Sequence, residues 1–407
     1  MLTGVVAVLY AWLIDLGYEI FAHGLSTCWW LPLLLSPSLA AIGVWLTRHF
    51  FAGSEGSGIP QVIAMLQGKR ERAPNLLTAR IVLGKIGVSF LCIAGGFTIG
   101  REGPTIHVGA ALMYNLRGLY PARLRRIGGP AVDRKLILAG AAAGLSAAFN
   151  TPLAGVVFAI EELMRSFERR INGVILSAIV FAGLVSLAMQ GNYTYFGSIA
   201  PSGQSHKTLA VAVVAIGVVA GIAGGVFCWL LLNPARWLPA RTMKWRSAHP
   251  ILFAAVCGLV IAAVGVGTSG HTFGSGYAEA RSMLEGTSQI AVSYPLLKMV
   301  SMIGSYLPGS PGGIFAPSLA IGAGLGNASH HVFSQLDLPT LIALGMVGYL
   351  AAVTQSPITA LIIVVEIIDG HSIVISLMAT ALVSSQVSKF FSPPLYEALS
   401  RRYVDPW

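Results

Sequence analysis

Charged residues are scarce in this chain of 407 residues. Lysine, arginine, aspartate and glutamate together make up 10% of it, whereas hydrophobic residues make up 55%. A soluble globular chain has roughly one quarter of its residues charged. The scarcity therefore excludes an ordinary water-soluble protein and predicts that much of the chain is surrounded by lipid.

Cysteine is also rare, with four in the chain, and none of them forms a C-x-x-C pair. This pattern indicates neither a disulfide framework nor a metal site, and we expect no cofactor. The four residues lie within or beside apolar runs, where they are expected to pack: Cys28, Cys92, Cys228 and Cys257. A basic stretch is missing before the first apolar run, so we expect a first membrane helix there and not a cleaved signal peptide.

Long uncharged runs dominate what is present. Residues 209–232 and 251–266 each have roughly the length that crosses a bilayer as a helix, and the chain has room for roughly ten or more such segments. The runs are rich in glycine and do not alternate with polar residues, which favours helices over a lipid-facing barrel. The sequence predicts an all-α polytopic membrane protein, with residues 1–407 forming a single transmembrane domain.

The net charge of +10 comes from short basic loops between the apolar runs. Such loops mark the cytoplasmic side of a membrane, so they do not imply a nucleic-acid partner. We place these loops and the carboxy terminus in the cytoplasm of an inner or plasma membrane, and the connections 191–206 and 268–285 outside. The five clusters are Lys69, Arg70 and Arg72; Arg123, Arg125, Arg126, Arg134 and Lys135; Arg165, Arg169 and Arg170; Arg236, Arg241, Lys244 and Arg246; and Lys389, Arg401 and Arg402.

Glycine and proline interrupt many of the apolar runs. Broken helices at membrane depth are costly unless the freed backbone lines a polar cavity. Transporters use such breaks to aim the positive amino termini of half-helices at an anion near the membrane midplane. The breaks at 56–60, 100–104, 312–317 and 392–394 therefore predict an ion site.

An internal repeat accompanies these breaks. Aligning Pro152 with Pro357 pairs Glu161 with Glu366, and G-R-E-G-P at 100–104 matches G-I-F-A-P at 313–317. Two structural repeats, about 1–190 and 207–407, are expected to meet at a shared site. Because the acid at Glu161 is repeated in the second half as Glu366, we expect Glu161 to serve a structural task such as bonding exposed backbone at a helix end. Glu162 has no acidic counterpart.

The motifs supply candidate ligands for an anion. Ser57 in G-S-G-I-P is an N-cap candidate that could also donate to a dehydrated halide. In G-R-E-G-P, Glu102 lies at a helix start, where the helix dipole favours a negative charge, and Arg101 is its expected neutralising partner. An ionisable residue in a long apolar region is a functional candidate by default.

Two further segments offer donors. G-I-F-A-P presents the backbone N–H groups of Ile314 and Phe315 at another helix start, and P-P-L-Y-E-A-L presents the phenol of Tyr396. Each has a plain alternative, because Phe315 could be core and Tyr396 an interfacial anchor. His107 is expected to be a packed histidine without a role.

Taken together and in this order, the motifs strongly resemble the CLC family of chloride channels and proton-coupled chloride transporters, over nearly the whole chain. The resemblance implies inverted repeats with broken and re-entrant helices, and a homodimer with one pathway per subunit. It implies that chloride is bound by Ser57, Tyr396, Ile314 and Phe315. It also implies that Glu102 is a gate that carries a proton, and that Glu162 is an internal proton-transfer residue.

The resemblance leads us to expect a chloride/proton antiporter that is not an enzyme. A passive chloride channel of the same family is the alternative, although the channels lack an acid at the position of Glu162. Serine rather than proline in G-S-G-I-P favours chloride over nitrate. Compared with the family pattern, we expect the chain to begin after the usual amino-terminal cytoplasmic helix and to have no regulatory pair of nucleotide-binding modules after Tyr396. A remote alternative is an intramembrane serine protease, built on Ser269 and His271.

Overall fold

The computed structural model describes residues 1–67, 76–119, 122–164, 173–190, 206–287 and 290–404. Within these ranges the chain is helical, and extended pairing is confined to two isolated bridges. Three of the sequence expectations lie outside the described residues. They are the basic cluster at Lys69, Arg70 and Arg72, the basic cluster at Arg165, Arg169 and Arg170, and nearly all of the outward connection 191–206.

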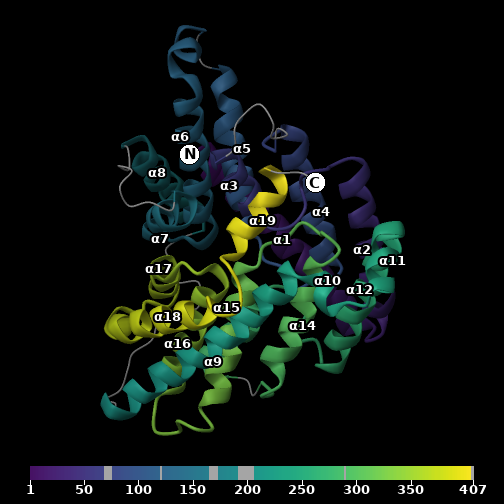
Figure 1. Ribbon diagram of the computed structural model, residues 1–407, viewed down its shortest axis with the longest axis vertical. Helices are drawn as coiled ribbons and strands as arrows, with labels where there is room; N and C mark the ends of the chain where they lie inside the picture. Colours follow the sequence, from purple (N-terminus) through teal and green to yellow (C-terminus); the bar gives the residue numbers. More distant parts are fainter. Residues whose placement is uncertain (68–75, 120–121, 165–172, 191–205, 288–289, 405–407) are drawn as a thin grey trace.

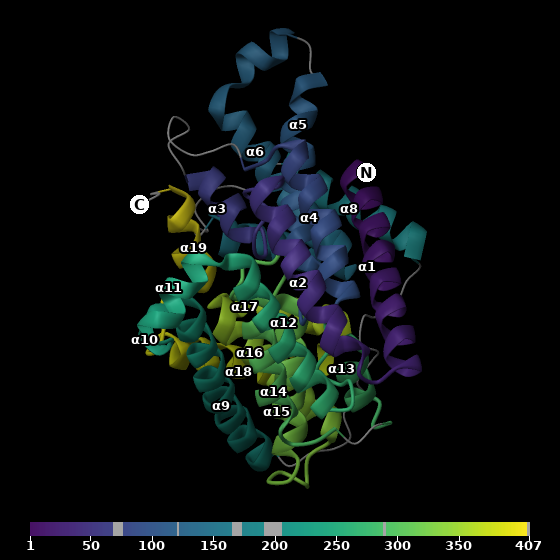
Figure 2. The ribbon, with the colours of Figure 1, turned by 90° about the vertical axis from the view of Figure 1, so that its right-hand side faces the viewer.

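The helices of the first half lie largely above those of the second half in both views (Figures 1 and 2). In the first half they are α1 (Leu2–Thr27), α2 (Leu31–His49), α3 (Ile59–Gln67), α4 (Ala79–Ala94), α5 (Glu102–Leu116), α6 (Ala122–Phe149), α7 (Pro152–Phe158) and α8 (Gly173–Gln190), with a 3-10 turn at Arg117–Leu119 and a π-helical turn at Ala159–Met164.

The second half continues in the same manner. Its helices are α9 (His206–Leu232), α10 (Pro234–Trp237), α11 (Ala240–Ala248), α12 (Pro250–Gly267), α13 (Tyr277–Leu284), α14 (Tyr294–Tyr306), α15 (Phe315–Ser329), α16 (Leu338–Thr354), α17 (Pro357–Ile368), α18 (Val374–Ser388) and α19 (Leu395–Val404), with a 3-10 turn at His371–Ile373. The last helix, α19, crosses to pack against α3 of the first half (Figure 1).

Four helices of the described residues are long and apolar enough to span a membrane by themselves: α1, α2, most of α9, and α12. The sequence predicted room for roughly ten or more such segments, against these four among the described residues. Glycine and proline divide the remaining apolar sequence into shorter helices, such as α16, α17 and α18. The spanning helices expose large apolar side chains, among them Leu9, Val211 and Leu252, as expected for a surface that faces lipid.

The two halves pack their helices in the same pattern. α5 packs on α6 as α15 packs on α16, and α6 packs on α8 as α16 packs on α18. Glycines let the first pair of helices in each half approach closely. A Cβ atom added to Gly140 would lie 2.2 Å from the carbonyl oxygen of Gly109, and one added to Gly345 would lie 2.2 Å from that of Gly322. Small residues at such crossings are typical of membrane helices.

Two carboxylates connect the halves reciprocally. The carboxylate of Glu161 accepts hydrogen bonds from the N–H groups of Ile358 and Thr359, at 3.1 and 2.6 Å, in the first turn of α17. The carboxylate of Glu366 accepts from Leu153 and Ala154, at 3.2 and 2.8 Å, in the first turn of α7. The expected role of Glu161 in bonding exposed backbone at a helix end is thus confirmed, and the exchange relates α7 and α17 by a local two-fold axis.

Replacing either carboxylate is expected to destabilise the fold. Glu161→Gln and Glu366→Gln should each lower stability by about 1–3 kcal/mol, because hydrogen bonds to a charged acceptor are lost at a helix start. The matched control is Glu285→Gln, which removes a surface ion pair with Arg281 between two exposed side chains, with an expected change within about 0.5 kcal/mol. Thermal unfolding of the purified proteins in detergent measures the difference. Equal effects of all three changes would contradict the capping role.

Candidate functional site

Three broken segments meet at the centre of the site through their backbones. Gly100 and Gly313 exchange two hydrogen bonds, at 2.8 and 2.7 Å, and the N–H group of Gly312 donates to the carbonyl oxygen of Gly56 at 3.0 Å. These contacts bring together the starts of α3, α5 and α15. Three motifs that are far apart in the sequence therefore form one structure, as the broken helices predicted. They are G-S-G-I-P, G-R-E-G-P and G-I-F-A-P.

The G-S-G-I-P loop is shaped by its glycines. Gly56 and Gly58 have φ values of 59° and 92°, which favour glycine. A Cβ atom on Gly58 would also lie 2.5 Å from the Cβ atom of His107. His107 is buried, and its Nε2 atom lies 2.8 Å from the carbonyl oxygen of Leu76. The expectation that this histidine is a packed residue is confirmed.

Ser57 lies where a helix cap was expected. It is fully buried, and its Oγ atom accepts a hydrogen bond from the N–H group of Ile59, at 3.3 Å, at the start of α3. The N–H group of Ser57 itself donates to the hydroxyl of Tyr306, also at 3.3 Å. The capping role and a role toward a ligand are compatible, because a serine hydroxyl that accepts one bond keeps its own proton to donate.

Glu102 is placed against the start of a helix from the other half. It begins α5, its side chain is buried, and its Oε2 atom accepts from the N–H group of Ala316, at 3.4 Å, in the first turn of α15. In the part of the chain that the structure describes, its Oε1 atom has no hydrogen-bond partner. The carboxylate thus occupies a position at which the positive end of a helix would attract an anion.

Ile314 and Phe315 form the start of α15. Ile314 is the N-cap, Phe315 is the first helical residue, and both are buried. The first N–H groups of a helix have no acceptor within it, so these two residues are suited to bind a negative group. The ring of Phe315 is held by Phe149 and Phe158, each with its centroid 6.2 Å away.

Helix α19 brings Tyr396 to the start of α15. Its ring centroid lies 6.0 Å from that of Phe315, and the side chain is fully buried. Its hydroxyl has no hydrogen-bond partner among the described residues. Burial without a partner costs free energy, and it does not fit an interfacial anchor, whose polar end reaches water. A ligand at this position would satisfy the hydroxyl.

Glu162 and Glu161 are adjacent in sequence but bond different partners. Glu162 belongs to the π-helical turn, is 1% exposed, and its Oε2 atom accepts a hydrogen bond from the hydroxyl of Ser356, the N-cap of α17. A solvated surface carboxylate is therefore excluded for Glu162. Arg165, which the sequence placed near it, lies outside the described residues.

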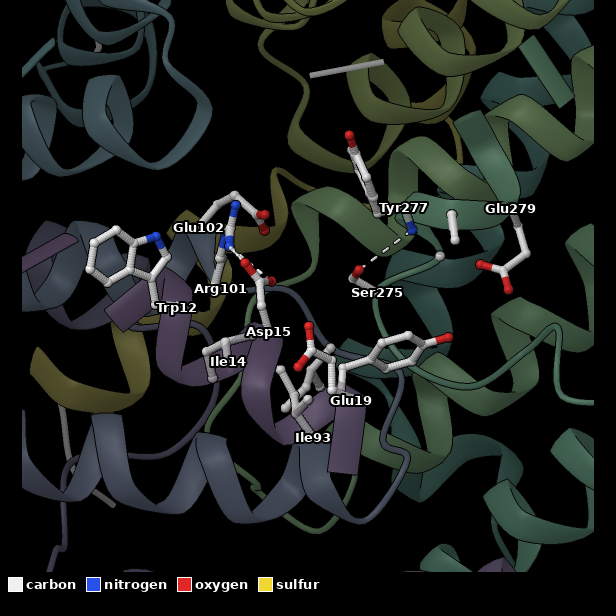
Figure 3. A pocket seen from close by; sticks show the side chains of 14 residues that line it. Trp12, Ile14, Asp15, Glu19, Ile93, Arg101, Glu102, Ser275, Tyr277 and Glu279 are labelled. Atoms are coloured by element: carbon white, nitrogen blue, oxygen red, sulfur yellow. Dashed lines mark hydrogen bonds and ion pairs between the residues drawn. The ribbon is translucent and has the colours of Figure 1, made fainter. Parts of the chain in front are cut away.

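The sequence missed the partner that Arg101 has in the structure. Both carboxylate oxygens of Asp15 on α1 accept from the Nη1 atom of Arg101, at 2.9 and 3.1 Å (Figure 3). Arg101, which was expected to neutralise Glu102, thus also pairs with Asp15, because α1 packs against α5.

Two buried lysines were also missed. Nζ of Lys85 donates to the carbonyl oxygens of Glu55 and Gly56, at 3.2 and 2.8 Å. Nζ of Lys298 donates to those of Thr272, Phe273 and Gly274, at 3.1, 2.9 and 3.0 Å. The sequence carried a signal, because each lysine precedes its motif residue, Glu102 or Phe315, by the same spacing (102 − 85 = 315 − 298 = 17).

Two cavities approach the motif loops. One, of 540 Å³, reaches Glu102 and is bordered by α1 and by residues 275–279 (Figure 3). The other, of 120 Å³, reaches Gly56 and Tyr306 and is bordered by Arg246 and Arg402. The first lining holds more carboxylates than cations, whereas the second holds two guanidinium groups and one carboxylate, that of Glu55.

The geometry gives no support to a serine nucleophile. His271 directs its Nδ1 atom toward the carboxylate of Glu279, at 3.9 Å. Ser269 occupies a left-handed turn with φ of 56°, and no hydrogen bond between Ser269 and His271 is found in the described part of the chain. A nucleophile needs a base within hydrogen-bond reach.

Taken together, the helices and loops bring the starts of α3, α5 and α15 and the ring of Tyr396 close together, in a chain whose described residues include four helices long and apolar enough to span a membrane. The family described as voltage gated chloride channel matches residues 39–389. The chain therefore belongs to the CLC family of voltage-gated chloride channels and transporters.

Individual relatives extend this result. The H(+)/Cl(-) exchange transporter ClcA of Yersinia pestis is 28% identical over 392 residues, covering 92% of this chain and 78% of that protein. ClcA of Salmonella arizonae is 29% identical over 401 residues, covering 92% and 79%. Among solved structures, a slow cyanobacterial Cl−/H+ antiporter has a TM-score of 0.82 and 25% identity, covering 99% of this chain and 96% of its own. A CLC-type fluoride/proton antiporter has a TM-score of 0.79 and 22% identity, with 98% and 96% covered.

Proposed function

We propose that the protein exchanges chloride for protons across a membrane. The observation that carries this proposal is the contact between Glu102 and the first turn of α15, because a carboxylate and a chloride ion would compete for the same N–H donors. Protonation removes the negative charge of the carboxylate and weakens its hold on the helix start. The anion then takes the vacated position, so that one residue couples the two ions.

The anion is held by groups from both halves of the chain. Ser57 and Tyr396 supply hydroxyl donors, and Ile314 and Phe315 supply backbone N–H groups at the start of α15. Such donors replace part of the water that a halide loses on entering the protein. The hydroxyl of Tyr396, which is buried and has no hydrogen-bond partner among the described residues, supports this assignment most directly.

The proton takes a separate route through Glu162. A proton that travels toward Glu102 cannot share the anion's path comfortably, and it needs a titratable group on the cytoplasmic side. Glu162 is buried and bonded to Ser356, which suits a group that binds and releases a proton away from bulk water. The buried acid at this position favours exchange over a passive channel of the same family, which needs only the anion site.

The relatives support the same conclusion. Two of them bear the name of H(+)/Cl(-) exchange transporters, and one structural neighbour is a Cl−/H+ antiporter. The proposal includes two repeats, about 1–190 and 207–407, placed in an inner or plasma membrane with the carboxy terminus and the basic loops in the cytoplasm. It also includes a homodimer, which rests on the family resemblance alone.

Tyr396→Phe is expected to weaken chloride binding without harming the fold. The change removes a hydroxyl that has no partner in the described part of the protein, so chloride affinity should fall by roughly tenfold while the melting temperature is kept or raised. Backbone donors remain, so the tyrosine is not essential alone. Titration calorimetry with chloride and thermal unfolding measure the two effects, and Ser57→Ala is expected to act in the same direction on affinity.

Tyr10→Phe is the matched control. The hydroxyl of Tyr10 bonds to the Oγ atom of Ser89, at 2.6 Å, in a buried contact between α1 and α4. This variant should lose about 1–2 kcal/mol of stability and keep its chloride affinity. Unchanged affinity in Tyr396→Phe, Ser57→Ala and the double variant together would rule out the anion site.

Glu102→Gln and Glu162→Gln are both expected to separate chloride movement from proton movement. The first mimics the protonated gate and leaves the anion path open, and the second removes the cytoplasmic proton acceptor. In proteoliposomes with a chloride gradient, each variant should pass chloride while proton flux falls to the level of protein-free vesicles. Uphill proton transport by Glu102→Gln would contradict the gate.

Glu161→Gln is the control for Glu162. It carries the same change one residue away, but its carboxylate bonds backbone N–H groups of α17. We expect normal coupling and lower stability. Loss of coupling in Glu161→Gln with normal coupling in Glu162→Gln would reverse the two roles.

A further inference from the structure

The cavity of 540 Å³ that reaches Glu102 has an acidic lining. Its walls hold four carboxylates, those of Asp15, Glu19, Glu102 and Glu279, against one cation, Arg101. With all of these groups ionised, the lining has a net charge of −3 (one positive charge and four negative charges), and with Glu102 protonated, as exchange requires, it has −2. A cavity with this charge concentrates cations.

The unusual charge arises at a loop that repeats the anion-site loop. Gly274, Ser275 and Gly276 match Gly56, Ser57 and Gly58: the glycines of both loops have positive φ, and the Oγ atom of Ser275 accepts from the N–H group of Tyr277 at 3.4 Å, as that of Ser57 accepts from Ile59. A buried lysine lies behind each loop, Lys298 and Lys85 respectively.

One residue reverses the electrostatics of the second loop. Five positions after the first glycine, the first loop has Gln61 and the second has Glu279. Gln61 is neutral and bonds the carbonyl oxygens of Gly53 and Glu55. Glu279 places a carboxylate in the first turn of α13, where it offsets the helix dipole and faces His271. The second loop is therefore not a second site for an anion.

A buried acceptor points into the same cavity. The Oε1 atom of Glu102 lacks a hydrogen-bond partner in the described part of the chain, the residue is 1% exposed, and it lines the cavity (Figure 3). Glu19 is exposed at the cavity mouth, and no ion pair holds it within the described ranges. A ligand that donates hydrogen bonds and carries positive charge would satisfy both groups.

We propose that this cavity binds a small organic cation with primary ammonium groups, of the linear diamine class. The carboxylates come from three elements, α1, the start of α5 and α13, so they suit separated charges on one chain. The described residues contain no cluster of three ligands that could hold a metal ion. The rings of Trp12 and Tyr18 offer apolar and cation–π surface to the methylene stem and ammonium groups.

The bound cation covers Glu102 from the side of the 540 Å³ cavity. It stabilises the ionised carboxylate and stands between that group and the solution, so it opposes the protonation that exchange requires. This consequence rests on the proposed function, whereas binding itself does not.

Calorimetry with 1,4-diaminobutane on the purified protein at low ionic strength tests the binding. The wild type should bind at about millimolar concentration or tighter, and Glu19→Gln should weaken binding several-fold, since one exposed carboxylate of the wall is removed. The matched control is Glu285→Gln, an exposed glutamate at the end of α13 outside the cavity lining, which should bind like the wild type. Glu102→Gln removes a second carboxylate of the lining and should weaken diamine binding independently.

Three results would overturn the proposal. They are the absence of binding heat in the wild type, equal weakening of diamine binding by Glu19→Gln and Glu285→Gln, and a binding heat from potassium chloride equal to that from the diamine at matched ionic strength.

A second experiment adds the diamine to one side of proteoliposomes, where exchange should slow only when the diamine is on the side of this cavity. Binding without such slowing would contradict the cover over Glu102, and absence of proton coupling would contradict only the proposed function.

Discussion

Buried helix starts are the constraint on which the rest of this structure depends. A helix that begins inside a membrane protein exposes N–H groups and a partial positive charge where no water is present to accept hydrogen bonds. Here carboxylates from the opposite half accept them: Glu161 at α17, Glu366 at α7 and Glu102 at α15. The kind of contact that joins the two halves at α7 and α17 therefore also brings a carboxylate to the start of α15.

The three carboxylates differ in how firmly they are held. Glu161 and Glu366 each accept two N–H groups and are related to each other by the local two-fold axis. Glu102 accepts one long bond, and the equivalent residue of the second half is Phe315, which has no carboxylate. Two caps thus each bond two N–H groups, and the third bonds one N–H group at a longer distance. This difference is what the proposed exchange uses, since a weakly bonded carboxylate is the easiest one for an anion to replace.

Local motifs and the repeat predicted much of this arrangement. The positions of Ser57, Glu102, Phe315 and Tyr396 at helix starts follow from glycine, proline and polar residues in one short segment each. The role of Glu161 followed from its counterpart Glu366. What the sequence did not predict depends on packing. The Asp15 partner of Arg101 lies on another helix, and glycine and proline divide the apolar sequence into helices shorter than a full span.

The central claim is that one chain couples the movements of two ions. Purified protein in liposomes, with a chloride gradient, no initial pH gradient and both ions recorded together, tests it most directly. The account predicts that chloride running down its gradient drives protons the opposite way, building a pH difference that a proton leak dissipates. Chloride flux of normal size with protons remaining at their passive distribution would contradict exchange and leave a passive channel.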